Sequence, residues 1–282
     1  MSSVPVMEIF KGCRGDKFKY FILQVLKLST LKKEYYPLLL DREGMVMYER
    51  AFTHKTANKV HNYEYLEFLG DTTLNKGIAW YLSRRFTQLN CPEGVKVLTR
   101  LKINLISKRS FARFAKRLGF WNFISADMDV RNTKMDKTLE DVFESFFGVT
   151  ELLLDQKIAV GVGYQICYSM IKTLLDRDHI SLQYTDLFDA KTRLKEVFDQ
   201  YRDSIGTLKY NTEKVDRIHN VTAVCVNSSQ SRSTPFVLGT GSAPLKADAS
   251  QRAAEQAIAT LKELGFTRTL PDDYKLFCDG CD

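Results

Sequence analysis

The sequence predicts a chain of two domains, the first all-α and the second a small α+β module with the element order α-β-β-β-α. Between about Leu38 and Leu175 nearly every segment repeats its apolar residues at helical spacing, whereas beyond about Asp176 β-rich runs stand between two helical stretches. A chain of 282 residues, 44% of them hydrophobic, is long enough for one large or two ordinary packed domains. We therefore expect a soluble, globular protein.

The first element expected is an amphipathic helix from Phe18 to Leu28, within an N-terminal extension over residues 1–31. We favour packing of this helix on the following domain over a targeting or membrane role, because its apolar residues recur at helical spacing. The all-α domain is expected over residues 32–176. Its helices should break near Asn90-Cys91-Pro92, at Gly119 and over the polar stretch from Asp127 to Lys137.

The second domain is expected over residues 188–265, after a linker at 177–187 and before a tail at 266–282. A helical stretch from Ala190 to Tyr201 precedes β-rich runs at Val221–Val226 and Phe236–Leu238, and an alanine-rich helix from Ala247 to Leu264 follows them. This order predicts the α-β-β-β-α arrangement.

The charge balance favours a polyanionic partner without identifying one. The chain has 41 basic and 34 acidic side chains, a formal charge of +7 and a pI near 9.0. Its six scattered cysteines suit a reducing compartment, and for the single CxxC at Cys278 and Cys281 we favour free thiols over structural zinc. Because no signal sequence or long apolar run occurs, we expect an intracellular, cytoplasmic protein with no membrane partner.

A cluster of carboxylates is the most informative feature of the stretch from Asn62 to Leu74. At 100° per residue, Glu64, Glu67 and Asp71 fall within roughly 60° of one another on one helical face. Like charges at these spacings destabilise an isolated helix, so the cluster favours something that neutralises it. A divalent cation is the obvious candidate.

A second acidic pair, Asp141 and Glu144, lies three residues apart between Leu139 and Gly148. Each acidic group alone is more often a solvated helix face. Two such helices brought together in one domain would make an oxygen-rich site suited to Mg²⁺, with Mn²⁺ as a substitute, rather than to zinc.

Three ordered motifs resemble the ribonuclease III family of double-stranded-RNA endonucleases. Asn62 to Leu74 resembles the family signature Asn-Glu-Arg-Leu-Glu-Phe-Leu-Gly-Asp-Ser-Val-Leu, and Ala51 to Thr56 resembles the Ala-Leu-Thr-His-Arg-Ser before it. Leu139 to Gly148 resembles the second acidic motif, Ala-Asp-Val-Phe-Glu-Ala-x-x-Gly. The departures are mild, with Tyr65 where arginine is usual and Thr72 where serine is usual.

The resemblance implies that Glu67, Asp71, Asp141 and Glu144 are the metal-binding catalytic carboxylates. It makes Glu64 an accessory acidic residue and matches Glu93 to an acidic position at the family's dimer interface. It also implies a homodimer that leaves 5′-phosphate and 3′-hydroxyl ends with short 3′ overhangs. Phe68 is then a candidate interface residue, although burial in the monomer core explains it equally well.

The second domain resembles a double-stranded-RNA-binding domain, which implies RNA contacts at three places. These are the first helix, with Lys191, Thr192, Lys195 and Glu196; the loop before the second strand, with His219; and the start of the last helix, with Lys246. The family's basic cluster at that last helix is reduced here to Lys246-Ala247-Asp248, so we expect weaker RNA binding by this domain. A basic run in the first domain suits either phosphate contacts or a solvated face: Lys102, Lys108, Arg109, Arg113, Lys116 and Arg117.

A rival interpretation is a non-catalytic protein that sequesters duplex RNA. Relatives that have lost activity usually lose a metal-binding carboxylate, and all four are present here, which favours the enzyme. The unmatched N-terminal extension and the acidic tail suggest a divergent lineage such as that of a large DNA virus.

Overall fold

The structure, a computed structural model, describes residues 8–226 and 236–277 and has two compact units, Met1–Ile180 and Ser181–Asp282. The cysteine pair Cys278 and Cys281 lies outside the described residues. Among the helices described, none is long and apolar enough to cross a membrane.

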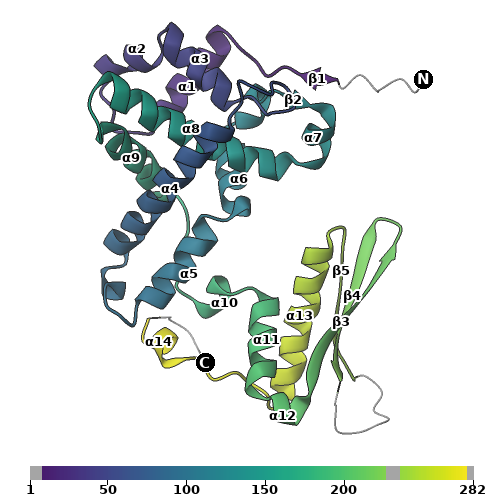
Figure 1. Cartoon of the computed structure of the whole chain (residues 1–282). Coiled ribbons are helices and arrows are strands. Elements are labelled where there is room, and N and C mark those ends of the chain that lie inside the picture. The colour runs from purple at the N-terminus through teal and green to yellow at the C-terminus, as the bar shows by residue number, and fades with distance from the viewer. Residues whose placement is uncertain (1–7, 227–235, 278–282) are drawn as a thin grey trace, which may run out of the picture. The chain divides into compact units, whose positions relative to one another are not determined.

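Helices α4 and α8 cross at the centre of the first unit, as Figure 1 shows. Most of α8 is buried, and it contacts the helices on every side. The helices of this unit are α1 (Asp16–Leu26), α2 (Tyr36–Leu39), α3 (Arg42–Ala51), α4 (Glu64–Arg85), α5 (Val95–Leu105), α6 (Lys108–Arg117), α7 (Met128–Thr133), α8 (Met135–Lys157) and α9 (Val162–Asp176).

The N-terminal segment is an integral part of this unit. On α1, Phe18 and Phe21 are buried against Phe52 and Phe123, and the rings of Phe21 and Phe123 stack with centroids 4.1 Å apart. Strand β1 (Ile9–Phe10) pairs antiparallel with β2 (Ala126–Asp127). The expectation that the first helix packs on the following domain is confirmed.

Two of the three expected helix breaks are confirmed, and the third is confirmed in part. Gly119, with φ of +80°, follows the end of α6, and Asn90-Cys91-Pro92 separates α4 from α5. The polar stretch from Asp127 to Lys137 contains a break at Lys134, between α7 and α8, but most of it is helical. The Asp127 carboxylate caps α7 by accepting a hydrogen bond from the Val130 N–H at 2.7 Å, and α8 already begins at Met135.

The second unit has two long helices packed on one face of a three-stranded antiparallel sheet in the order β3-β4-β5 (Figure 1). The last helix lies so close to the sheet that a Cβ on Gly239 or Gly241 would come within 2.4 or 2.3 Å of a backbone oxygen of Ala253 or Ala249. Glycines in the strand and alanines in the helix permit this approach. The elements are α10 (Tyr184–Leu187), α11 (Ala190–Gln200), α12 (Arg202–Ile205), β3 (Thr207–Val215), β4 (Ile218–Val226), β5 (Phe236–Ala243), α13 (Lys246–Glu263) and α14 (Asp272–Lys275).

The sequence predicted His219 in the loop before the second strand, and this prediction is wrong. It is the second residue of β4 and stands opposite Lys214 on β3 and Ala243 on β5. The tight turn between β3 and β4 consists of Asp216, with φ of +54°, and Arg217. This turn is so short that the strand pairing reaches His219.

Candidate metal centre

Two glycines set the close approach of α4 and α8. A Cβ on Gly70 of α4 would come within 1.8 Å of the Glu144 carbonyl oxygen, and a Cβ on Gly148 of α8 would come within 2.1 Å of the Leu66 carbonyl oxygen. Real Cβ atoms do not approach oxygens this closely, so the crossing requires glycine at both positions. The carboxylates one turn away on each helix are thereby brought together.

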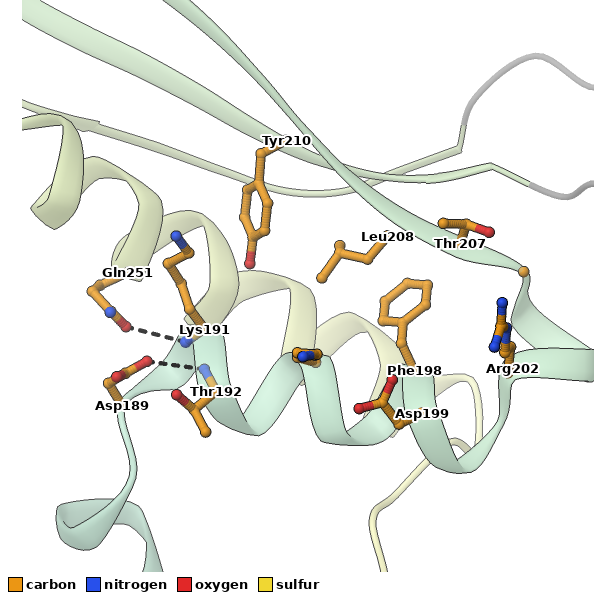
Figure 2. A pocket seen from close by; sticks show the side chains of 12 residues that line it. Asp189, Lys191, Thr192, Phe198, Asp199, Arg202, Thr207, Leu208, Tyr210 and Gln251 are labelled. Atoms are coloured by element: carbon orange, nitrogen blue, oxygen red, sulfur yellow. Dashed lines mark hydrogen bonds between the residues drawn. The ribbon is translucent and has the colours of Figure 1, made fainter. Parts of the chain in front are cut away.

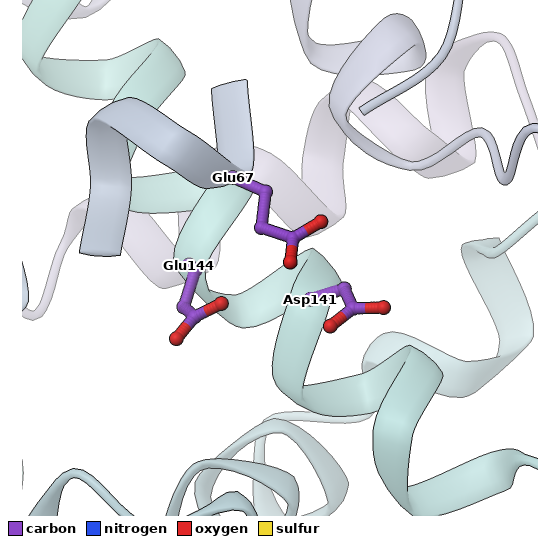
Figure 3. A group of neighbouring side chains, drawn as sticks. All are labelled: Glu67, Asp141 and Glu144. Carbon is purple, nitrogen blue, oxygen red and sulfur yellow. The ribbon is translucent and has the colours of Figure 1, made fainter. Parts of the chain in front are cut away.

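Three carboxylates meet at this crossing, Glu67 from α4 and Asp141 and Glu144 from α8. Figure 3 shows the Glu67 side chain directed toward the two acidic side chains of α8. Each residue offers one oxygen, and these oxygens all lie within 4.8 Å of one another. Asp141 and Glu144 are only 6% and 7% exposed, and Glu67 is partly buried. We call Glu67, Asp141 and Glu144 the carboxylate cluster.

Two further side chains bind Asp141, one at each carboxylate oxygen. The Tyr63 hydroxyl donates a hydrogen bond of 2.8 Å to Asp141 Oδ2. Lys137 Nζ, one turn earlier on α8, lies 2.6 Å from Asp141 Oδ1, 3.3 Å from Glu140 Oε2 and 3.8 Å from Glu67 Oε1. The lysine ammonium therefore provides positive charge among oxygens that would otherwise repel one another.

The carboxylate cluster shifts the titration of its own members. Burial, followed by the charge of Asp141, raises the pKa of Glu67 to about 7. Burial, followed by the charges of Glu140 and Asp71, raises the pKa of Glu144 to about 8. Burial opposes the charge on Lys137, but its hydrogen bond to Asp141 and the surrounding carboxylates still raise the pKa of this lysine. Carboxylates that hold protons near neutral pH mark a site with unmet demand for positive charge.

Asp71 lies at the edge of the site and is not a member of the carboxylate cluster. Its side chain is exposed, and its Oδ1 accepts a hydrogen bond of 2.8 Å from the Asn75 amide, one turn along α4. The charge of Asp71 nevertheless reaches Glu144, whose pKa it helps to raise. Three of the four predicted ligands are therefore assembled, and the fourth lies beside them.

The accessory residues predicted from the sequence lie outside the carboxylate cluster. Glu64 is half-exposed and pairs with Lys55 at 2.7 Å. Glu93 is exposed in the turn before α5. The Phe68 side chain is 68% exposed, so burial in the monomer core, one of its two interpretations, is wrong.

Sequence reasoning missed Lys137, Glu140 and Tyr63. Lys137 was assigned to a helix break, although its spacing of four residues before Asp141 is that of an ion pair on one helical face. Glu140 is next to a predicted ligand, and burial raises its pKa as well. Tyr63 precedes the first turn of α4, and no sequence spacing links it to Asp141.

Three of the four candidate RNA-binding residues of α11, all except Glu196, line a cavity of about 700 Å³ in the second unit. Figure 2 shows Lys191 and Thr192 at one end of this cavity and Asp199 and Arg202 at the other. Lys195 also lines it, and the Tyr210 hydroxyl, which is buried without a hydrogen-bond partner, points into it. Lys246 is exposed at the first position of α13.

Glu196 has partners of its own within the second unit. Its carboxylate accepts a hydrogen bond from the Tyr184 hydroxyl and forms an ion pair with Arg268. Part of the basic run in the first unit is also paired. Arg113 binds Asp178 through both terminal nitrogens at 2.6 Å, Arg117 lies 3.5 Å from the same carboxylate, and Lys116 lies 2.7 Å from Asp136. These three basic side chains therefore have acidic partners within the first unit.

Comparison with known proteins decides the family. A putative ribonuclease 3 of Invertebrate iridescent virus 6 is 39% identical to this chain over 282 residues, covering 95% of this chain and 96% of the relative. The chain belongs to the ribonuclease III family. The family model for the ribonuclease III domain matches residues 64–155, which include Asp71 and the whole carboxylate cluster. Membership in the ribonuclease III family supports endoribonuclease activity on RNA.

Other ribonuclease III relatives are more distant. A putative ribonuclease 3 of Frog virus 3 is 35% identical over 250 residues, which are 88% of this chain and 64% of the relative. Ribonuclease 3 of Bacillus cereus is 28% identical, covering 84% of this chain and 96% of the relative. The two viral relatives agree with the expected large DNA virus lineage. Among solved structures, the ribonuclease III nuclease domain of Campylobacter jejuni is 23% identical with a TM-score of 0.41, covering 57% of this chain and 97% of that chain.

The residues of the carboxylate cluster fit a divalent cation. They supply only oxygen donors, which Mg²⁺ and Mn²⁺ prefer. Asp141 Oδ1 is buried, and its contact is with the Lys137 ammonium at 2.6 Å. A divalent cation would take the place of this ammonium at the oxygen.

Proposed function

We propose that this protein is an endonuclease of double-stranded RNA that depends on Mg²⁺, with Mn²⁺ as a substitute. Glu67, Asp71, Asp141 and Glu144 are the proposed ligands and catalytic residues. The carboxylate cluster carries the proposal, because two buried carboxylates and one partly buried carboxylate from two helices meet around a single lysine ammonium. One ammonium does not neutralise three carboxylates, so the site favours a further cation.

Each side chain of the site has a separate task in this proposal. Glu67, Asp141 and Glu144 hold the cation, and Tyr63 fixes the orientation of Asp141 by donating to its Oδ2. Asp71, on the same face of α4 and one turn from Glu67, completes the set from the solvent side. A bound divalent cation would activate a water molecule and relieve charge on the leaving oxygen of the phosphodiester.

The second unit supports duplex RNA as the substrate. Its α-β-β-β-α order and its exposed Lys191 and Lys195 are those expected for a domain that reads the shape of an RNA duplex. His219 and Lys246 provide two further candidate contacts. Lys246 is followed by Asp248 in the first turn of α13, so we propose that this unit contributes less affinity than a domain with a full basic cluster there.

A homodimer is the proposed assembly, with two sites that cut opposite strands and leave 5′-phosphate and 3′-hydroxyl ends with short 3′ overhangs. Phe68 supports this proposal, since a phenylalanine that is 68% exposed on the same helix as the site suits a protein contact. A solved structure of the Campylobacter jejuni nuclease domain is described as flexible in a region involved in dimer formation.

A non-catalytic duplex binder is the rival function. It would need no buried carboxylates, and replacing them by apolar residues would stabilise its fold. The glycine crossing, the shifted pKa values of Glu67 and Glu144, and the Tyr63 contact all favour a working site over this rival.

Cleavage of a long RNA duplex tests the proposal. The full chain with Mg²⁺ should cut the duplex into fragments with two-nucleotide 3′ overhangs, whereas a chelator should stop cleavage and leave binding intact. Asp136→Asn is the matched control for substitutions in the cluster, because Asp136 is an acidic residue of α8 that pairs with Lys116 outside it. Binding without cleavage under all metal conditions would favour the rival function.

A further inference from the structure

A groove between α4 and α9 combines exposed aromatic rings with cations and does not include the carboxylate cluster. Its volume is about 580 Å³. The side chains that give it its character are Lys76, Trp80 and Arg84 from α4 and Tyr164, Gln165 and Tyr168 from α9. We call this surface the aromatic groove. Lys76, Trp80 and Arg84 are spaced four residues apart, so they share one face of α4.

Each cation of the aromatic groove lies over a ring. The Arg84 guanidinium carbon is 5.4 Å from the centroid of Trp80 and 5.0 Å from that of Tyr168. Lys76 Nζ is 4.1 Å from the centroid of Tyr164. Trp80 remains 51% exposed. The rings therefore hold the two cations in place without removing them from solvent.

The aromatic groove is positive, because its described lining has two basic side chains and no acidic one. None of the described residues that line it carries a carboxylate, and no described carboxylate pairs with Lys76 or Arg84. Glu151 lies nearby. Burial raises the pKa of Tyr164 most, and the charge of Glu151 adds to the effects of burial and of Tyr168. Glu151 accepts a hydrogen bond from Thr73 and pairs with neither cation. An anionic ligand would thus meet two unpaired cations.

We propose that the aromatic groove binds an unpaired nucleotide of RNA, with its base stacked on Trp80 and its phosphate at Arg84 and Lys76. Bases in a duplex are stacked on one another, whereas unpaired bases expose the faces that aromatic side chains bind. An acidic peptide would satisfy the two cations but has no flat ring for the indole. The inference rests on the proposed action on RNA and adds a site for single-stranded segments that flank a duplex.

Tryptophan fluorescence provides a local test, because the chain has only two tryptophans. Trp121 is partly buried beside Arg131 and away from the aromatic groove lining, so Trp121→Phe leaves Trp80 as the sole reporter. A short single-stranded RNA, added to the full chain with a chelator, should quench this fluorescence with saturation. Trp80→Phe with Trp121 retained should show no saturable quenching. The readout is binding alone, so it stands apart from any failure of cleavage.

Charge variants test the phosphate contacts. Arg84→Gln and Lys76→Gln should each weaken RNA binding about tenfold and lower the slope of log affinity against log salt by about 0.7. Trp80→Ala, measured with fluorescently labelled RNA, should weaken binding by about tenfold through lost stacking. Lys172→Gln is the matched control, because Lys172 is on α9, pairs with Asp176 and does not line the aromatic groove.

Three outcomes would overturn the inference. The first is absence of saturable quenching of Trp80 by single-stranded RNA. The second is an equal effect of Lys172→Gln and Arg84→Gln, which would show diffuse electrostatic attraction. The third is quenching by a polyglutamate peptide at lower concentration than by RNA, which would assign the aromatic groove to an acidic protein segment. Thermal unfolding of each variant checks that it is folded.

Discussion

The backbone of Gly70 lies against the carbonyl of Glu144, so closely that a Cβ on Gly70 would be 1.8 Å from that oxygen. The crossing of α4 and α8 depends on Gly70 and also positions Glu144, a proposed metal ligand. The glycine and the ligand are therefore parts of one arrangement. Loss of the close approach should disperse the carboxylates even though no acidic residue is changed.

Gly70→Ala tests this relationship. The added methyl group must push α4 and α8 apart, which should cost about 1–3 kcal/mol in the free energy of unfolding and abolish most cleavage. Chemical denaturation and a cleavage assay measure the two effects. Gly119→Ala is the control, because its Cβ meets no atom within 4 Å and only its φ of +80° is strained. It should cost about 1–2 kcal/mol and cleave normally. Equal cleavage by both variants would contradict the account.

The metal-free protein should lose stability as pH rises from about 4.5 to 8. Glu67 and Glu144 have folded pKa values of about 7 and 8 against 4.5 for an ordinary glutamate, so the folded state binds more protons than the unfolded state in this window. With a chelator present, the unfolding temperature should fall by on the order of 5 °C across the window. Mg²⁺ should flatten this dependence. A Tm that rises over the same range without metal would contradict the burial of these carboxylates.

Lys137→Met should strengthen Mg²⁺ binding. The Lys137 ammonium lies within 3.8 Å of three carboxylates, where it repels a second cation, and its removal leaves their charge uncompensated. Affinity for Mg²⁺, measured by calorimetry without RNA, should rise about tenfold, or ~1.4 kcal/mol. Lys116→Met is the control, since Lys116 pairs with Asp136 outside the carboxylate cluster. Weaker Mg²⁺ binding by the Lys137 variant would mean that this lysine supports the site instead of competing with the cation.

Phe68→Asp should convert the proposed homodimer into a monomer. A charge at the centre of an apolar contact is left without a partner and loses its hydration, which typically costs several kcal/mol. Light scattering after size-exclusion chromatography measures the mass. Val46→Asp, at a 60% exposed apolar position on α3, should leave the mass unchanged. A dimer that survives Phe68→Asp would place the interface elsewhere.

The sequence indicated the two acidic helices because the spacing of residues on one helical face can be read from a short stretch of sequence. The resemblance to the family motifs indicated that the two helices form one site. The residues around them were harder to predict. Lys137 was missed because the polar stretch up to it was interpreted as a break, whereas α8 already begins at Met135. The Tyr63 contact with Asp141 joins residues 78 apart in sequence. Such contacts depend on the crossing geometry of α4 and α8, which no periodicity encodes.

The second unit shows the same limit. Its order of elements followed from β-rich runs between two helical stretches, and these became α11, β4, β5 and α13. The ion pair of Glu196 with Arg268 could not be predicted, because the sequence analysis assigned Arg268 to the C-terminal tail. His219 was placed in a loop because the length of the strand pairing beyond Val221 depends on the turn at Asp216.

Mg²⁺-dependent cleavage of a long RNA duplex by Glu144→Gln, beside the parent chain and Asp136→Asn, tests the central claim most directly. The substitution keeps the shape of a buried side chain but removes the charge of a proposed ligand. We predict loss of at least about a thousandfold in cleavage rate, with RNA binding intact and Asp136→Asn near the parent rate. Cleavage by Glu144→Gln at the parent rate would contradict the assignment of the carboxylate cluster as the catalytic metal site.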